Sequence, residues 1–173
     1  MNGPPCVGAE LRLTAFHEAG HAVAALVTRC ELREVSVVPA PGRLGSSVFR
    51  APRRPSGQAR REAITRHLAG PAAEAIHLGH NAVEFLEAEA SCGGGATDFA
   101  AARRACGAGG ETAYLSWHWR RTIGLLERWW PGVEAVAREL LDAEAPILGI
   151  QARLMIDGAM TPLTLPPAIE RPA

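Results

Sequence analysis

Two histidines four residues apart, with a glutamate directly after the first, constrain this chain more than any other feature. His17 and His21 lie in the sequence HEAGH, inside a stretch whose apolar residues recur at helical spacing from Leu11 to about Thr28. Side chains at positions i and i+4 project from the same face of a helix, one turn apart. The segment therefore predicts a helix that presents two imidazoles side by side.

Two imidazoles so placed can occupy two corners of a zinc tetrahedron, and Glu18 lies beside them, where it can act on a bound water. This is the H-E-x-x-H pattern of zinc peptidases, in which the glutamate is the general base. The alternative is that both histidines are hydrogen-bonded within a packed core, because 6 His and 15 Glu would produce the pattern by chance in roughly two of a hundred such chains. Gly20 favours the metal site, because its small size leaves room for another element to approach the metal. Glycine inside a helix costs about 1 kcal/mol relative to alanine, so its presence needs a packing or functional reason.

A catalytic zinc site of this kind needs a third protein ligand. The longer metzincin motif is excluded, because Ala24 and Val27 stand where it requires Gly and His. Asp98 is the first candidate: it follows a glycine-rich segment and opens a predicted helix, where a carboxylate is electrostatically favoured. Glu74 is the competitor, either as a ligand or as a partner of a ligand histidine. The other histidines are interpreted as surface or core residues: His67, His77, His80 and His118.

The remaining patterns predict a mainly α-helical domain with one small β-sheet. Glycine and proline at 70 and 71 predict a break or kink in one helix, and Thr97 is expected to cap another. The tryptophans at 117, 119, 129 and 130 are expected in the core, with an interface patch as the alternative. The expected elements are strands over 34–38 and 44–49, a helix over 58–78, a helical turn near 84–88, and helices over 97–105, 112–129, 131–143 and 146–155.

Length and composition indicate one folded domain, because 173 residues are too few for two domains of ordinary size. We expect a flexible lead-in over 1–10, the domain over 11–160 and a proline-rich tail over 161–173. The 18 basic residues, all of them Arg, balance 18 acidic residues, so we expect no nucleic-acid partner.

The sequence also predicts no membrane segment and a cytoplasmic location. Its longest stretch without Asp, Glu or Arg covers 158–169 and is broken by prolines, which is too short to span a bilayer. The first residues lack the basic start and apolar core of a secretory signal. The four cysteines form no C-x-x-C pair and are expected to be free thiols: Cys6, Cys30, Cys92 and Cys106.

Residues 15–23, which read AFHEAGHAV, resemble the catalytic helix of the zinc-peptidase domain of FtsH-type, AAA-linked membrane proteases, where HEAGHA is typical. Residues 35–39 (VSVVP) and 42–45 (GRLG) are similar to that family's strand-turn-strand, and 68–76 (LAGPAAEAI) to its GGRxAEE-type helix. Residues 95–99 (GATDF) resemble its GASNDI segment, which supplies the third metal ligand. The resemblance extends from about residue 11 to residue 160.

The resemblance implies a zincin-like helical peptidase domain with Zn²⁺ as cofactor. By it, the metal ligands are His17, His21 and Asp98, the general base is Glu18, and Glu74 lies near the site. The implied activity is hydrolysis of peptide bonds in flexible or unfolded segments without ATP, with the substrate added as a strand beside 44–49.

The chain also departs from the family. It has no lysine and hence no G-x-x-x-x-G-K-[ST] phosphate loop, so we do not expect it to drive unfolding with ATP. Pro71 stands where the family usually has Arg. A homo-oligomer and a separate ATPase or adaptor are the further partners that the resemblance leaves open.

Two other functions stay open at this point. One is a catalytically degenerate, peptidase-like module that binds a metal or a peptide, and the other is a metal-free helical interaction domain. Glu18 argues against a purely structural zinc, because such a site needs no base and prefers four protein ligands. Turnover distinguishes the enzyme from the degenerate module, and bound metal distinguishes that module from the metal-free domain.

Overall fold

The computed structural model describes residues 7–40, 44–50, 56–80, 83–91, 95–107, 112–143 and 145–161. Its elements, in chain order, are α1 (Val7–Val27), β1 (Leu32–Ser36), β2 (Ser46–Phe49), α2 (Gly57–His77), α3 (Phe85–Ser91), α4 (Ala96–Cys106), α5 (Thr112–Arg128), α6 (Trp130–Asp142), β3 (Ile147–Leu148) and α7 (Gly149–Met160). The prediction of a mainly helical fold with a small sheet is confirmed.

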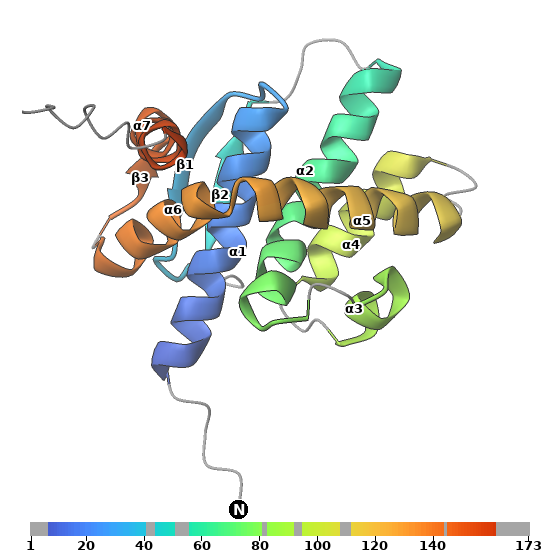
Figure 1. Ribbon diagram of the computed structural model, residues 1–173, viewed down its shortest axis with the longest axis horizontal. Coiled ribbons are helices and arrows are strands. Elements are labelled where there is room, and N and C mark those ends of the chain that lie inside the picture. Colours follow the sequence, from blue (N-terminus) through green and yellow to red (C-terminus); the bar gives the residue numbers. More distant parts are fainter. Residues whose placement is uncertain are drawn as a thin grey trace, which may run out of the picture.

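Helix α1 runs through the middle of the molecule and packs along α2, while α5 and α6 cross these two helices nearly end to end (Figure 1). The buried face of α1 is built from small side chains, among them Ala15, Ala19 and Ala22, so α2 can approach it closely. Gly20 marks the tightest point, because a Cβ there would collide with the backbone carbonyl of Ala69 on α2. This packing fixes the HEAGH segment against α2.

The sheet is antiparallel with the strand order β2-β1-β3, so β2 forms one of its edges. Val35 of β1 is fully buried and pairs with Ser47 of β2 on one side and with Ile147 of β3 on the other. β1 begins two residues earlier than the predicted strand over 34–38, and β2 lies within the predicted 44–49. The sheet packs against α1 and α7 and brings β2 beside the HEAGH helix.

Two local predictions need correction. The break expected at Gly70 and Pro71 is absent, because α2 runs as one helix from Gly57 to His77, and the kink that was its alternative stays a prediction. Both residues are buried in a packed stretch, and that packing outweighs the missing hydrogen bond of the proline. α4 begins at Ala96 with Gly95 as its N-cap, so Thr97 lies inside the first turn. Asp98 in that same turn carries the negative charge that favours a helix start.

The expected core position holds for Trp119, which is fully buried and whose Nε1–H donates to the carbonyl of Val83 at 2.9 Å. Trp117 on α5 is not a core residue, because 45% of its surface is exposed. Cys30 and Cys106 are free thiols, as predicted, while the other two cysteines lie outside the described residues.

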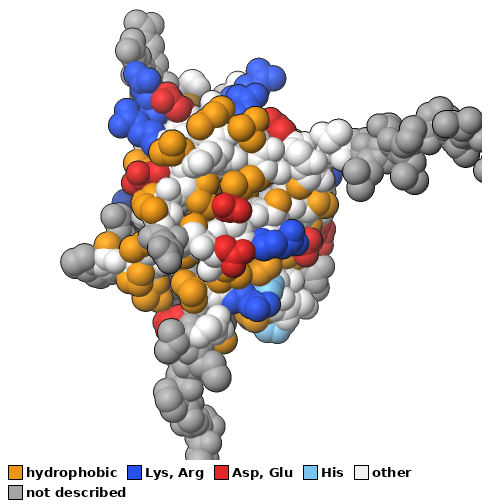
Figure 2. All heavy atoms as spheres, turned by 90° about the vertical axis from the view of Figure 1, so that its left-hand side faces the viewer, with side chains coloured by type: hydrophobic (Ala, Val, Ile, Leu, Met, Phe, Trp, Pro, Cys, Tyr) orange, Lys and Arg blue, Asp and Glu red, His pale blue; other side chains and the backbone are white. Residues whose placement is uncertain are grey.

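Hydrophobic side chains are also spread over the face of the molecule on which α7 lies (Figure 2). The exposed ones on β3 and α7 are Leu148, Ile150 and Leu154. Within the described ranges, no helix combines the length and the apolarity that crossing a membrane requires. Of the predicted lead-in, residues 7–10 form the start of α1 and 1–6 lie outside the described residues, as does the predicted tail beyond 161.

Candidate metal centre

His17 and His21 project from one face of α1, and their Nε2 atoms lie 3.1 Å apart. Both residues are buried, with 8% and 6% of their surfaces exposed. Asp98, in the first turn of α4, places its Oδ2 3.0 Å from Nε2 of His17 and 3.5 Å from Nε2 of His21. The structure therefore brings together the three residues that the sequence analysis selected as metal ligands.

The three converging atoms have a spacing that suits a zinc ion. Zinc binds nitrogen and carboxylate oxygen at about 2.0–2.1 Å, so two corners of its tetrahedron are about 3.3 Å apart. The separations here are 3.0, 3.1 and 3.5 Å. Two imidazole nitrogens and one carboxylate oxygen also form a donor set that leaves a fourth position for water or substrate. The residues fit a metal ion, and its identity as zinc stays a prediction.

The second nitrogen of each histidine ring has its own partner. Nδ1 of His17 lies 2.7 Å from Oε1 of Glu74, and Nδ1 of His21 donates to the backbone carbonyl of Arg66 at 2.8 Å. Such partners fix the orientation and tautomer of a ligand imidazole, so that Nε2 faces the metal. Glu74 thus lies at the far nitrogen of His17, outside the converging donor set, which favours the orienting role over the ligand role.

Hydrogen bonding in the site couples protonation to metal binding. Burial disfavours a charged His17, but hydrogen bonds to Asp98 and Glu74 outweigh it and raise the pKa of His17 to about 10. Burial also disfavours a charged Asp98, yet hydrogen bonds from His17, His21 and His67 hold the pKa of its carboxyl well below its usual range. Because a ligand imidazole must be neutral, a metal ion bound at Nε2 would displace a proton from His17.

Glu18 follows His17 on α1 and lies outside the converging donor set. Its side chain is buried, with 6% of the residue exposed, and its Oε2 accepts a hydrogen bond from the hydroxyl of Ser47 at 2.7 Å. Ser47 lies on β2, so the edge strand holds this carboxylate in place. A carboxylate fixed in this way by a neutral donor keeps its capacity to accept a proton.

Three contributors to the site were not found from the sequence: Ser47, the carbonyl of Arg66, and His67, whose Nδ1 lies 3.9 Å from Oδ1 of Asp98. His67 had a usable signal, because it stands seven residues before Glu74 and therefore on the same face of α2. The other two had none. The remaining histidines lie elsewhere: His77 stacks on Phe16 at 3.8 Å, His80 is exposed, and His118 is buried on α5.

The chain matches no protein-family model, and no curated protein sequence matches it. The function of this site must therefore follow from its residues and their chemistry.

Replacing Gly70 with Ala should weaken zinc binding by at least about tenfold. A Cβ at this position of α2 would lie 2.5 Å from Nε2 of His17 and 2.6 Å from Nε2 of His21. Neither ring can move aside freely, because the far nitrogen of each is hydrogen-bonded. Zinc affinity is measured by competition with a chromogenic chelator.

Gly158→Ala in α7 is the matched control, because it makes the same change inside a helix where a Cβ would meet nothing within 4 Å. This variant should bind zinc as the wild type does. Wild-type zinc affinity in Gly70→Ala would mean that the metal does not lie between the two Nε2 atoms and α2.

Proposed function

We propose that the chain is a zinc-dependent endopeptidase with a zincin-like helical domain, similar to the peptidase domain of FtsH-type proteases. The observation that carries this proposal is the convergence of Nε2 of His17, Nε2 of His21 and Oδ2 of Asp98, at separations of 3.0–3.5 Å. A buried glutamate follows the first ligand on the same helix. Three ligands, an open position and an adjacent base are what metal-assisted hydrolysis requires.

When bound, zinc would polarise a peptide carbonyl and lower the pKa of a water molecule towards about 7. Glu18 accepts a proton from the attacking water and passes it to the leaving amine, which makes it the general base and then the general acid. The hydroxyl of Ser47 keeps the carboxylate of Glu18 oriented for both transfers. Glu74 and the carbonyl of Arg66 hold the two imidazoles in their ligand orientation.

Strand β2 is the element that we propose binds the substrate. In the described part of the chain, β2 pairs with β1 alone, which leaves its other edge with backbone groups available to a new strand. An extended peptide can add to such an edge through main-chain hydrogen bonds. Ser47 connects this edge directly to Glu18, so a peptide bound there would pass beside the base. Flexible or unfolded segments are the substrates that can adopt this extended form.

The experiment is cleavage of an unfolded, fluorescently labelled casein by the zinc-loaded chain without ATP. We expect turnover that 1,10-phenanthroline abolishes and added zinc restores, because the reagent removes the metal from a three-ligand site. The isomer 1,7-phenanthroline is the matched control, since it has a similar shape and does not chelate. It should leave cleavage unchanged.

Two results would contradict the proposal. Absence of cleavage with one zinc ion bound per chain would favour the degenerate, metal- or peptide-binding module. Absence of bound zinc would exclude the metal centre. It would therefore exclude the zinc peptidase and also a degenerate module that binds a metal.

A further inference from the structure

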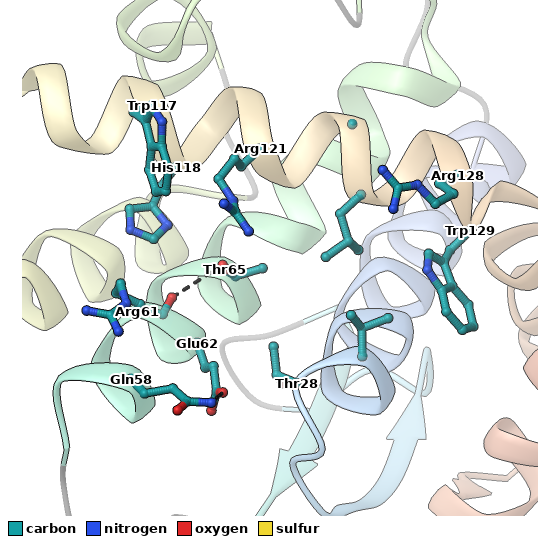
Figure 3. A pocket seen from close by; sticks show the side chains of 13 residues that line it. Thr28, Gln58, Arg61, Glu62, Thr65, Trp117, His118, Arg121, Arg128 and Trp129 are labelled. Atoms are coloured by element: carbon teal, nitrogen blue, oxygen red, sulfur yellow. Dashed lines mark hydrogen bonds between the residues drawn. The ribbon is translucent and has the colours of Figure 1, made fainter.

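A groove of about 720 Å³ lies between α2 and α5 and reaches the end of α1 at Thr28. In Figure 3, His118 and Arg121 project from α5 towards Arg61 on α2, and Arg128 enters from further along α5. The three α5 residues stand at 118, 121 and 128, which are spacings that keep them on one face of the helix. The volume is within the range of small-molecule sites, about 300–1,000 Å³.

The groove is positively charged. Arg61, Arg121 and Arg128 line it, and in the described part of the chain none of the three forms an ion pair with a carboxylate. Glu62 is the acidic residue among the lining side chains that the structure describes, and it accepts a hydrogen bond from Gln58 at 2.8 Å. Three guanidinium groups against one carboxylate leave a net of two positive charges.

His118 adds an unpaired polar group to the groove. Only 3% of the residue is exposed, and neither ring nitrogen has a hydrogen-bond partner within the described ranges. Burial, followed by the charges of Arg121 and Arg61, lowers the pKa of His118, so the ring is neutral and carries one N–H donor. A buried polar group without a partner is destabilising, because it has lost its hydrogen bonds to water. A ligand that accepts a hydrogen bond from His118 would remove this destabilisation.

We infer that the groove binds the phosphate group of a small molecule, with Arg61 and Arg121 as its cationic contacts and His118 as a further donor, while Arg128 adds positive charge two helical turns further along α5. Guanidinium groups match phosphate oxygens because they donate two parallel hydrogen bonds from a planar fork. A phosphate monoester carries about −1.5 to −2 charge at neutral pH, which complements the net charge of the groove. Trp117, with the guanidinium of Arg121 held 4.9 Å from its ring centre, keeps that arginine in place.

This site is separate from the metal centre, although α2 contributes to both. Arg66 donates to the hydroxyl of Thr28 at the rim of the groove, at 3.0 Å, while its carbonyl accepts from His21. The inference does not depend on peptidase activity, because its test measures binding alone. Either proposal can fail without the other.

The experiment is a calorimetric titration of the purified chain with inorganic phosphate and, separately, with adenosine monophosphate. Chloride keeps the ionic strength constant, and no zinc is added because zinc phosphate is poorly soluble. We expect saturable binding that Arg121→Gln weakens by at least about tenfold. Arg120→Gln is the matched control, because it removes the same charge from the next position of α5, which does not line the groove. It should change the affinity by less than about twofold.

The two probes distinguish the source of the phosphate group. Equal affinities for the two probes would show that free phosphate is sufficient for binding. Tighter binding of adenosine monophosphate, together with no binding of adenosine in a third titration, would identify a phosphorylated organic ligand. Lack of saturation by either probe up to about 10 mM would overturn the inference. Equal weakening by Arg121→Gln and Arg120→Gln would overturn it as well, because it would indicate a general charge effect. Circular dichroism of each variant confirms that it is folded.

Discussion

The Glu18→Gln variant should bind zinc as tightly as the wild type and hydrolyse peptides about 10²- to 10⁴-fold more slowly. Glu18 lies outside the set of donor atoms that converge on the metal position, so its replacement removes no ligand. Glutamine has the same size, and its side-chain oxygen can still accept the hydrogen bond from Ser47. It cannot take a proton from water. The measurements are bound zinc by elemental analysis and the initial rate of casein cleavage.

Glu139→Gln provides the control for this prediction, because it makes the same chemical change at an exposed position of α6. It should leave both zinc content and cleavage rate unchanged. Full activity in Glu18→Gln would exclude Glu18 as the base. Loss of zinc together with activity would show that Glu18 supports the metal, so that the loss of rate carries no information on proton transfer.

The helices that bury one strong apolar face were predictable from the sequence. α5 and α6 lie within one residue of their predicted bounds, because their apolar residues recur at the helical period and Pro131 marks the start of the second. The region of β3 was not predictable. Ile147 and Leu148 pair with β1, a contact with residues more than a hundred positions earlier, and α7 therefore begins at Gly149 and not at the predicted 146.

The metal site, too, was predictable from the sequence only in part. The positions of His17 and His21 follow from helix geometry alone, because four residues make about one turn. Asp98 was selected by its residue type and its place at a helix start, while its arrival beside the histidines depends on how α4 packs against α2. Ser47 approaches Glu18 only because the sheet folds back against α1. No local pattern encodes either contact.

Replacing Asp98 with Ala should weaken zinc binding by more than about 100-fold, because it removes one of the three ligands. For comparison, loss of a residue that only orients a ligand weakens metal binding by about 10- to 100-fold. The two remaining donors come from the same helix and leave the carboxylate corner of the triangle empty. Asp98→Asn tests the same role in a side chain of equal size. Zinc affinity is the quantity to compare, since Asp98 also holds a hydrogen bond to His17 whose loss lowers the stability of the metal-free chain.

Glu74→Gln separates the two candidates for the third ligand. Its side chain contacts Nδ1 of His17, on the side of the ring away from Nε2, so we expect a weakening of about 10- to 100-fold, smaller than that of Asp98→Ala. The reverse order would transfer the ligand role to Glu74 and leave Asp98 as a hydrogen-bond partner of the histidines. Equal, wild-type affinity in both variants would contradict a site in which a carboxylate completes the metal coordination.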